Sequence, residues 1–328
     1  MPLTCPVCGD AGFSVEVPAG QLSRESDLRA SFVGERLDHK PDESELMDLT
    51  RFMHGGSGRL LSCPSCGLLS REDEGPAHYE TDVYDPELLH HLYPRYVQAF
   101  EEKAGYKALL PNRAEILEVG SHLGAFLQTA EEWGWRPTGL DIGRMTSAFA
   151  RRQGTSVKRQ PFEDYSTLHP PSAIFIWNCF EQLDDPSEVL NHSYQLLKAH
   201  GLLVIRVPNA RFYRRQRAKL GNRHSGRTLK RLGYNNLLGF PYRYGYTQYA
   251  LDRILTANGF RPVAIYSSSL LTPPYPKVSG RILGEWRAVR REAETSLIGD
   301  GPWIEIVSRR VSDGNMALPE SILQTGIS

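Results

Sequence analysis

The sequence predicts an α/β protein with a doubly wound, seven-stranded, mostly parallel Rossmann-like sheet and a small metal-binding module at the N-terminus. From about residue 112 onward, short apolar segments alternate with amphipathic segments of about ten to fifteen residues, which is typical of βαβ units. Residues 1–75 differ, because they hold two CxxC pairs and few long apolar runs. A chain of 328 residues can form one large domain and one small one.

The apolar pattern places the individual elements. We expect strands at 115–119, 137–140, 155–157, 173–177, 202–207, 263–267 and 303–307. Helical spacing predicts helices at 123–133, 145–152, 186–197 and 247–258. Residues 85–110 show mixed three- and four-residue apolar spacing, which predicts one or two amphipathic helices interrupted near Pro94.

These elements divide the chain into four parts. We expect a zinc-binding module over 1–75, a helical linker or cap over 76–111, the main domain over 112–311 and a flexible tail over 312–328. An insert over 209–246 follows the fifth strand of the main domain. The first 75 residues are too few to bury a sufficient apolar core, so a metal ion would be their main stabilising element.

Composition limits the classes of partner. The formal net charge is zero, with 40% hydrophobic and 23% charged residues, so no general affinity for nucleic acid or membranes is indicated. The opening MPLTCPVCGD lacks the basic and apolar regions of a signal peptide, and no apolar run is long enough to span a membrane. We therefore expect a cytoplasmic, soluble protein.

Four of the five cysteines form two near-identical CPxCG motifs, Cys5–Cys8 and Cys63–Cys66. A two-residue gap lets both thiolates of a pair face one tetrahedral ion, and the following glycine lets the backbone curl so that its amides donate to sulfur. We predict one structural Zn²⁺ site, with rubredoxin-like iron as the alternative. Unrelated pairs or a redox pair are the other interpretation. Cys179 lies in an apolar run, where we expect a buried, inert thiol.

The segment ILEVGSHLGAF, residues 116–126, predicts a strand that ends in a glycine turn and opens a helix. Asp141 ends the next strand, where an acid can accept both hydroxyls of a ribose. A dinucleotide-binding fingerprint would place glycine at His122, because pyrophosphate needs close backbone approach. The turn therefore favours S-adenosylmethionine, which has no phosphate, over NAD.

These motifs resemble class I S-adenosylmethionine-dependent methyltransferases, in the branch whose first motif reads E-V-G-S-x-x-G-x-F-L. PFEDYS at 161–166 matches the segment that contacts adenine in that family, and 173–209 resembles its fourth strand, following helix and fifth strand. GYTQYALDRILTANGF resembles the helix before its sixth strand. Paired CPxCG motifs recur as a zinc-binding appendage in a subset of these enzymes. The resemblance covers most of the chain and says little about the substrate.

By position, the resemblance implies a set of cofactor-binding residues. These are Glu118, Gly120, Ser121 and Gly124 around the methionine end, Asp141 at the ribose, Ile142, Phe162 and Glu163 at the adenine, and Asn178 beside the sulfonium. Each also has a purely structural interpretation: the glycines can serve an ordinary turn, Asp141 can cap a helix, and Phe162 can pack in the core.

The catalytic residues are less defined. Gln182 stands where the family often has the histidine of a Glu-His pair, a candidate base in sugar C-methylating relatives, and glutamine cannot take up a proton. His122 is a possible substitute, or a turn residue bonded to backbone. Glu181 is a second catalytic candidate. Tyr246, like Tyr79 and Tyr84, could orient a substrate or simply pack.

Residues 211–231 contain nine Lys or Arg and no acid. This insert could form a basic lid that receives a phosphate-bearing substrate, a carrier protein or RNA, or a solvated loop. The function predicted is direct methyl transfer to O, N or C of a small acceptor: a sugar, natural-product or modified-peptide intermediate. An RNA methyltransferase, a non-catalytic cofactor-binding scaffold and a NAD-linked oxidoreductase are the alternatives. The last is weakened by His122.

Overall fold

The structure is a computed structural model that describes residues 4–22, 42–43, 58–72, 86–220, 228, 232, 242–268 and 301–311. The predicted tail over 312–328, Tyr79, Tyr84 and most of 221–241 lie outside the described residues. Within the described part, no helix has the length and apolar character needed to cross a membrane.

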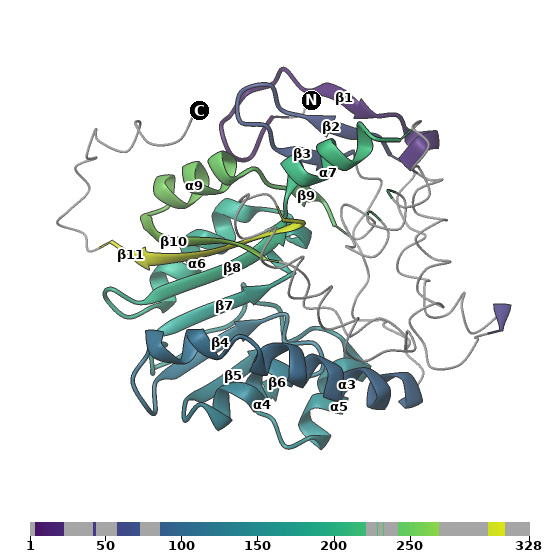
Figure 1. Cartoon of the computed structure of the whole chain (residues 1–328). Helices are drawn as coiled ribbons and strands as arrows, with labels where there is room; N and C mark the ends of the chain where they lie inside the picture. Colours follow the sequence, from purple (N-terminus) through teal and green to yellow (C-terminus); the bar gives the residue numbers. More distant parts are fainter. Residues whose placement is uncertain are drawn as a thin grey trace.

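A seven-stranded sheet forms the main domain, in the order β10-β11-β8-β7-β4-β5-β6 (Figure 1). Its strands are β4 (Glu115–Val119), β5 (Arg136–Leu140), β6 (Val157–Lys158), β7 (Ala173–Trp177), β8 (Leu202–Pro208), β10 (Phe260–Ser268) and β11 (Trp303–Arg310). Strands β4 to β8 run parallel, whereas β11 is antiparallel to both β8 and β10. This topology confirms the predicted fold class.

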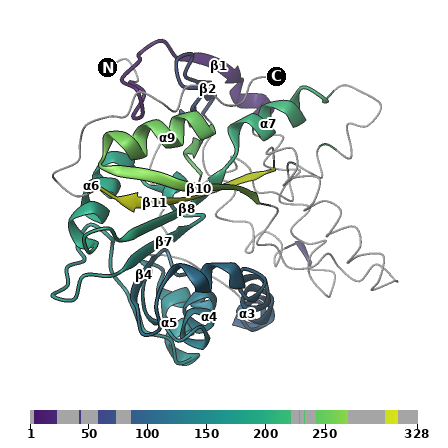
Figure 2. The same ribbon diagram turned by 60° about the vertical axis from the view of Figure 1, so that its left-hand side comes forward.

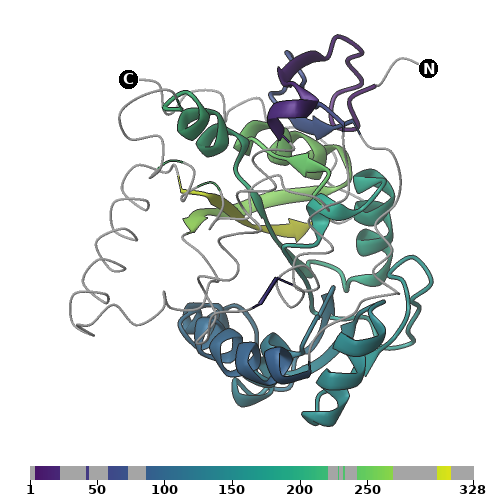
Figure 3. The same cartoon turned by 90° about the vertical axis from the view of Figure 1, so that its right-hand side faces the viewer.

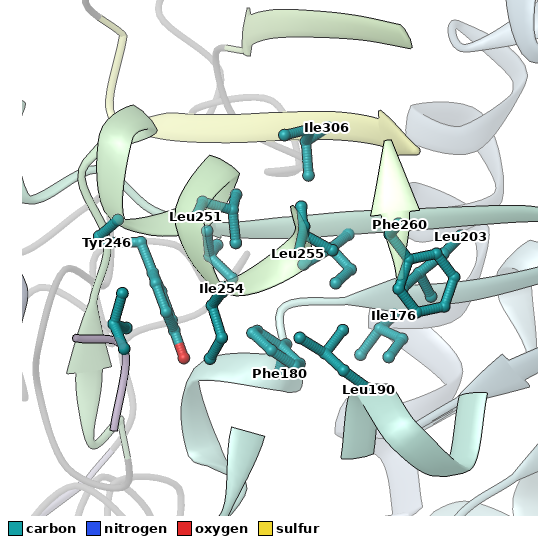
Figure 4. Close-up of a cluster of buried hydrophobic side chains, with 14 of the residues drawn as sticks. Ile176, Phe180, Leu190, Leu203, Tyr246, Leu251, Ile254, Leu255, Phe260 and Ile306 are labelled. Carbon is teal, nitrogen blue, oxygen red and sulfur yellow. The ribbon is translucent and has the colours of Figure 1, made fainter. Parts of the chain in front are cut away.

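Helices cover both faces of this sheet (Figure 2). Successive residues of a strand point to opposite faces, and both sets are apolar, so each face packs against helices. On one face, Leu117 of β4 belongs to a cluster with Leu190 and Ile254, from α6 (Pro186–Leu196) and α9 (Gln248–Ala257) (Figure 4). On the other face, Ile116 belongs to a cluster with Phe126 of α4 (Ala125–Glu132). The remaining described helices are α3 (Pro86–Glu101), the 3₁₀ helix η3 (Ala104–Leu109), α5 (Arg144–Arg152), the 3₁₀ turn η4 (Phe180–Gln182) and α7 (Ala210–Arg217).

The expected interruption at Pro94 was wrong, since α3 runs through it. Proline removes one helix hydrogen bond, and Pro94 is exposed, so nothing packs against the altered turn. Residues on either side hold the helix: Tyr93 meets Phe149 of α5 edge-on at 5.5 Å, and Phe100 packs on Phe126 at 5.1 Å. Tertiary packing outweighs the local cost of proline here.

The N-terminal module forms a second sheet, in the order β1-β2-β3-β9. Its strands are β1 (Ser14–Val17), β2 (Leu60–Ser62), β3 (Leu69–Arg71) and β9 (Tyr244–Gly245). The β2–β3 hairpin is the strand, turn and return strand expected around the second CxxC pair. Strand β9 lies at the end of the 209–246 insert, so this sheet joins two distant parts of the sequence. Figure 3 shows the module, in purple, next to α9, in light green.

Candidate cofactor and active site

The turn after β4 alternates between ordinary and left-handed backbone. Gly120 has a φ of 72°, His122 of 48° and Gly124 of 76°. His122 therefore stands in a conformation that favours glycine, at a cost of about 1 kcal/mol for a side-chain-bearing residue. The turn keeps the backbone path of a glycine-rich loop while carrying an imidazole where a dinucleotide fingerprint has only hydrogen.

Asp141 joins this turn to the end of β5. Its carboxylate accepts hydrogen bonds from the His122 amide at 2.8 Å, the Gly143 amide at 2.9 Å and the Thr146 hydroxyl at 2.6 Å. A carboxylate offers about four acceptor positions, so the protein takes three of them. Asp141 thus caps the turn that leads into α5, and its geometry leaves room for about one further hydrogen bond from a ligand.

A cavity of about 710 Å³ lies at the carboxyl ends of the parallel strands, where ligands bind in open α/β sheets. It brings together nine of the predicted site residues: Glu118, Gly120, Ser121, His122, Asp141, Ile142, Phe162, Glu163 and Asn178. The volume is in the range of pockets for drug-sized ligands.

Glu118 is the most unusual residue of this cavity. Its side chain is buried, and its Oε2 meets no hydrogen-bond donor among the described residues. Burial first, and then the nearby Asp141, raise the pKa of the Glu118 carboxyl well above its usual range. A buried, unpaired carboxyl costs free energy unless a cation or donor approaches it, so the site is suited to an ammonium group. The Ser121 hydroxyl, also buried in the cavity wall, likewise has no partner in the described part.

The Phe162 ring closes the end of the cavity near β6. It is buried and meets His192 edge-on at 4.8 Å, while the His192 ring nitrogen lies 3.0 Å from the Tyr165 carbonyl oxygen. Ile142 and Glu163 line the same end. This part of the lining combines an aromatic ring and an aliphatic side chain with one carboxylate.

Comparison with known proteins identifies the family of the chain. Residues 88–265, more than half of the chain, match the family model described as a methyltransferase domain. The chain is an S-adenosylmethionine-dependent methyltransferase. A search of curated proteins finds no match.

The methyltransferase also resembles solved structures. A putative S-adenosylmethionine-dependent methyltransferase from Listeria monocytogenes has 18% identity and a TM-score of 0.46, covering 65% of this chain and 98% of its own. A counterpart from Archaeoglobus fulgidus has 18% identity and a TM-score of 0.46, with 69% and 100% covered. The plantazolicin methyltransferase BpumL, with a pentazolic analog and SAH, has 13% identity and a TM-score of 0.43, with 69% and 92% covered.

Asn178 of the methyltransferase ends β7 in a left-handed conformation, with a φ of 53°. Arg206 donates to its Oδ1 at 2.8 Å, and Gln182 donates from its amide nitrogen to the Asn178 carbonyl at 2.6 Å. Arg206 is fully buried and forms a 3.2 Å ion pair with Glu305. Gln182, which occupies the usual histidine position, therefore helps hold the end of β7.

Three predicted residues are absent from the described cavity lining. Gly124 is the N-cap of α4. A Cβ there would lie 2.5 Å from the Thr155 hydroxyl, so glycine is needed at this position for the close packing against Thr155. Glu181 is fully enclosed, and burial raises the pKa of its carboxyl to about 8 against the opposing effect of Arg206. Tyr246 is fully buried against Phe180 at 5.5 Å (Figure 4), as its packing interpretation expects.

Cys179, which we expected to be a buried, inert thiol, is half-buried and lines the cavity. A Cβ at Gly120 would lie 2.7 Å from its sulfur, which gives that glycine a steric reason beyond its φ. Burial raises the pKa of the Cys179 thiol, so it stays protonated and unreactive at neutral pH.

The cavity lining also contains an aromatic wall that the candidate site residues did not include. Tyr96 and Phe100 of α3, Trp177 at the end of β7, and Tyr242 line the cavity, with Arg243 beside them. Tyr96 meets the His122 ring edge-on at 6.0 Å. The i, i+4 spacing of Tyr96 and Phe100 and the position of Trp177 at a strand end were available signals. Tyr242 and Arg243 belong to the aromatic-rich sequence NNLLGFPYRYGYT, residues 235–247, whose composition predicts a segment that closes over a small organic substrate or docks the lid.

The four cysteines of the two CPxCG motifs converge at one point. Their sulfurs all lie within 4.8 Å of one another, with Cys5 and Cys66 at 3.6 Å and Cys8 and Cys63 at 3.5 Å. Tetrahedral zinc thiolates have sulfurs about 3.8 Å apart, so the arrangement fits such an ion. Hydrogen bonds from Cys66 and from the amides of Val7 and Cys8 hold the pKa of the Cys5 thiol below its usual range.

The described half of the basic insert binds the module. Arg214 of α7 forms a 3.1 Å ion pair with Glu16, donates to the Gly67 carbonyl at 3.1 Å and contacts the Ser62 hydroxyl. Arg217 donates to Gln21 at 3.0 Å. These arginines therefore dock α7 on the N-terminal sheet, and the predicted lid role concerns residues that lie outside the described ranges.

Proposed function

We propose that the cavity binds S-adenosylmethionine across the ends of β4, β5 and β7 and that the enzyme methylates a small organic acceptor. The observation that carries this proposal is the unpaired, buried carboxyl of Glu118 in one cavity with Asp141. When bound, the cofactor supplies a methyl group on a positively charged sulfur, so the acceptor atom forms a bond to carbon as the carbon–sulfur bond breaks and S-adenosylhomocysteine leaves.

Each residue has a role that follows from its position. Glu118 would pair with the ammonium of the methionine part, and Asp141 would use its remaining acceptor position for one ribose hydroxyl. The lining at Phe162 would hold the adenine. Asn178, held by Arg206, would lie beside the sulfonium. Catalysis then depends mainly on alignment, because the sulfonium is already a strong electrophile.

The acceptor would enter on the aromatic wall of Tyr96, Phe100, Trp177 and Tyr242. An apolar, aromatic wall suits a sugar, natural-product or modified-peptide intermediate. Arg243 is the only Lys or Arg among the described lining residues, and its guanidinium lies 2.8 Å from Asp184, so a phosphate or carrier linkage would have to share it with that carboxylate. RNA would need several basic contacts, and the described arginines of α7 already serve the module.

Structural zinc completes the proposal. The four sulfurs form a closed set with no fifth His, Cys, Asp or Glu ligand in the described cluster, which suits a folding role rather than catalysis.

Calorimetry with S-adenosylhomocysteine and NAD tests the cofactor. We expect binding of the former and none of the latter. Asp141→Asn and Glu118→Gln should each weaken binding at least about tenfold. Asp164→Ala, an exposed acid in the same PFEDYS segment, is the matched control and should bind normally. Binding of NAD alone, or unchanged affinity in both variants, would refute the proposal.

A further inference from the structure

Two residues of the cavity lining directly precede the strand that completes the sheet of the cysteine module. Tyr242 and Arg243 line the cavity, and the next two residues form β9. Strand β9 pairs antiparallel with β3, with Leu69 opposite Gly245 (Figure 1). The module thus shares its sheet with the acceptor side of the cavity.

The backbone of Arg243 links the module to the turn after β7. Its carbonyl accepts from the Arg71 amide at 2.8 Å, and its own amide donates to the Glu181 carbonyl at 2.9 Å. Its guanidinium lies 2.8 Å from Asp184, and Tyr244 donates from its hydroxyl to the Asp184 carbonyl at 3.1 Å. Residues 181–184 begin three positions after Asn178, so the connection reaches the turn that follows β7.

The segment 243–247 is attached close to the cysteines at both of its ends. Strand β3 begins three residues after Cys66, within a knuckle in which the Cys63 amide donates to the Leu68 carbonyl at 2.9 Å. At the other end, the Thr247 hydroxyl donates to the Cys66 carbonyl at 2.8 Å and caps α9 by accepting from the Ala250 amide. The position of Cys66 therefore sets the position of residues 243–247.

The module has little that would fix this geometry without a metal ion. Strands β2 and β3 have three residues each, and so short a hairpin is marginal alone. Its apolar residues lie in clusters shared with the main domain: Cys63 and Cys66 with Tyr246 and Leu251 in one cluster, and others with α7. A tetrahedral ion would lock the knuckles that carry these contacts.

The cofactor half around Asp141 has none of these links among its described hydrogen bonds. The described hydrogen bonds of Asp141 run to His122, Gly143 and Thr146, all within the β4–α5 segment.

We propose that the metal ion held by Cys5, Cys8, Cys63 and Cys66 positions residues 242–243 of the acceptor wall, through the β3–β9 pairing, while leaving the cofactor half around Asp141 unaffected. The inference rests on the proposed function, which assigns one part of the cavity to the cofactor and the other to the acceptor. It makes the module a positioning part of the active site rather than an appendage.

Hydrogen exchange on the full-length protein tests this coupling. Zinc-loaded protein, protein stripped by a chelator, and stripped protein reloaded with zinc are compared. We expect stripping to speed exchange of the Arg243 and Tyr246 amides about tenfold or more, with reversal on reloading. The amides of His122 and Gly143 should keep their rates, and the Kd for S-adenosylhomocysteine should stay within about threefold.

A set of variants separates the coupling from loss of metal. Thr247→Val removes the hydroxyl that contacts Cys66 and should speed exchange at 243–246 with zinc still bound, whereas Thr247→Ser should behave as the parent. Thr256→Val, an exposed position on the same helix, is the control. Unchanged exchange at Arg243 on stripping would overturn the proposal, as would equal loss of protection at His122. Absence of S-adenosylhomocysteine binding to loaded protein would refute the proposed function instead, and the exchange comparison would still decide the coupling.

Discussion

The amide of His122 donates a 2.8 Å hydrogen bond to the carboxylate of Asp141. This contact joins the turn after β4 to the end of β5, and it exists only because His122 adopts a φ of 48°. The cap and cofactor-binding interpretations of Asp141 are therefore compatible, because the acid that orders the turn also lines the cavity. One carboxylate thus both orders the turn and lines the cavity.

Replacing His122 by glycine separates its backbone role from its side chain. Glycine adopts the same φ without strain, so we expect the free energy of unfolding to change by no more than about 1 kcal/mol and S-adenosylhomocysteine to bind normally. If the imidazole is a general base, methyl transfer falls about a hundredfold or more. Denaturant melts and initial rates measure both. His122→Asn tolerates the same φ without a base; full activity in both variants would assign His122 to the turn alone.

Cofactor binding should release a proton from Glu118. Burial and Asp141 raise the pKa of this carboxyl in the ligand-free protein, and a nearby ammonium would lower it. Between the two pKa values, affinity should therefore rise with pH. Calorimetry in two buffers of different ionisation enthalpy measures the proton directly. The dependence on buffer should vanish in Glu118→Gln, and its persistence there would assign the proton to another group.

The buried ion pair of Arg206 and Glu305 should dominate stability near the site. Lys103 contacts Glu305, and the Tyr106 hydroxyl donates to it at 2.8 Å. Arg206→Met leaves the buried Glu305 carboxylate with only Lys103 and Tyr106 as partners among the described residues. We therefore expect the free energy of unfolding, measured in denaturant melts, to fall by about 3 kcal/mol or more. The double variant Arg206→Met/Glu305→Leu should lose less than the single one. An additive double variant would contradict a coupled pair.

The same pair predicts sensitivity to acid. Burial alone would raise the pKa of Glu305, but Lys103 and Arg206 outweigh burial and hold it below its usual range. A lowered pKa contributes stability above the unfolded value, about 4.3, and this contribution is lost as pH falls through the folded pKa. As the pH falls from about 6 to about 3, melts of the parent protein should show a loss of stability that Glu305→Gln lacks. Identical pH profiles would show that Glu305 does not titrate in this window.

Metal analysis should find about one zinc per chain in purified protein. Cys63→Ser should lower this content and the melting temperature together, because zinc binding contributes directly to folding. A visible iron–thiolate absorption would indicate the rubredoxin-like alternative. Less than about half an equivalent of either metal would contradict the four-cysteine site.

Local pattern predicted the strands well where burial is complete. Ala173–Trp177 was expected as a strand and forms one over the same five residues, all buried, because a continuous apolar run of that length suits an interior parallel strand. Prediction was wrong at Pro94, where ring packing on Phe149 and Phe126 outweighs a propensity penalty. It was incomplete at Glu181, which is close in sequence to the cavity-lining Gln182 but turns into the core.

The sequence by itself determined the fold class, the glycine turn and the two CPxCG motifs, because each depends on spacings within a local stretch of chain. Only the tertiary structure decided that Tyr242 and Arg243 face the cavity, that α7 docks on the module, and that β9 completes the sheet of β3. The physical reason is that these contacts join residues far apart in the chain. Their free energy comes from shared burial and from strand pairing across that distance, which no local periodicity encodes.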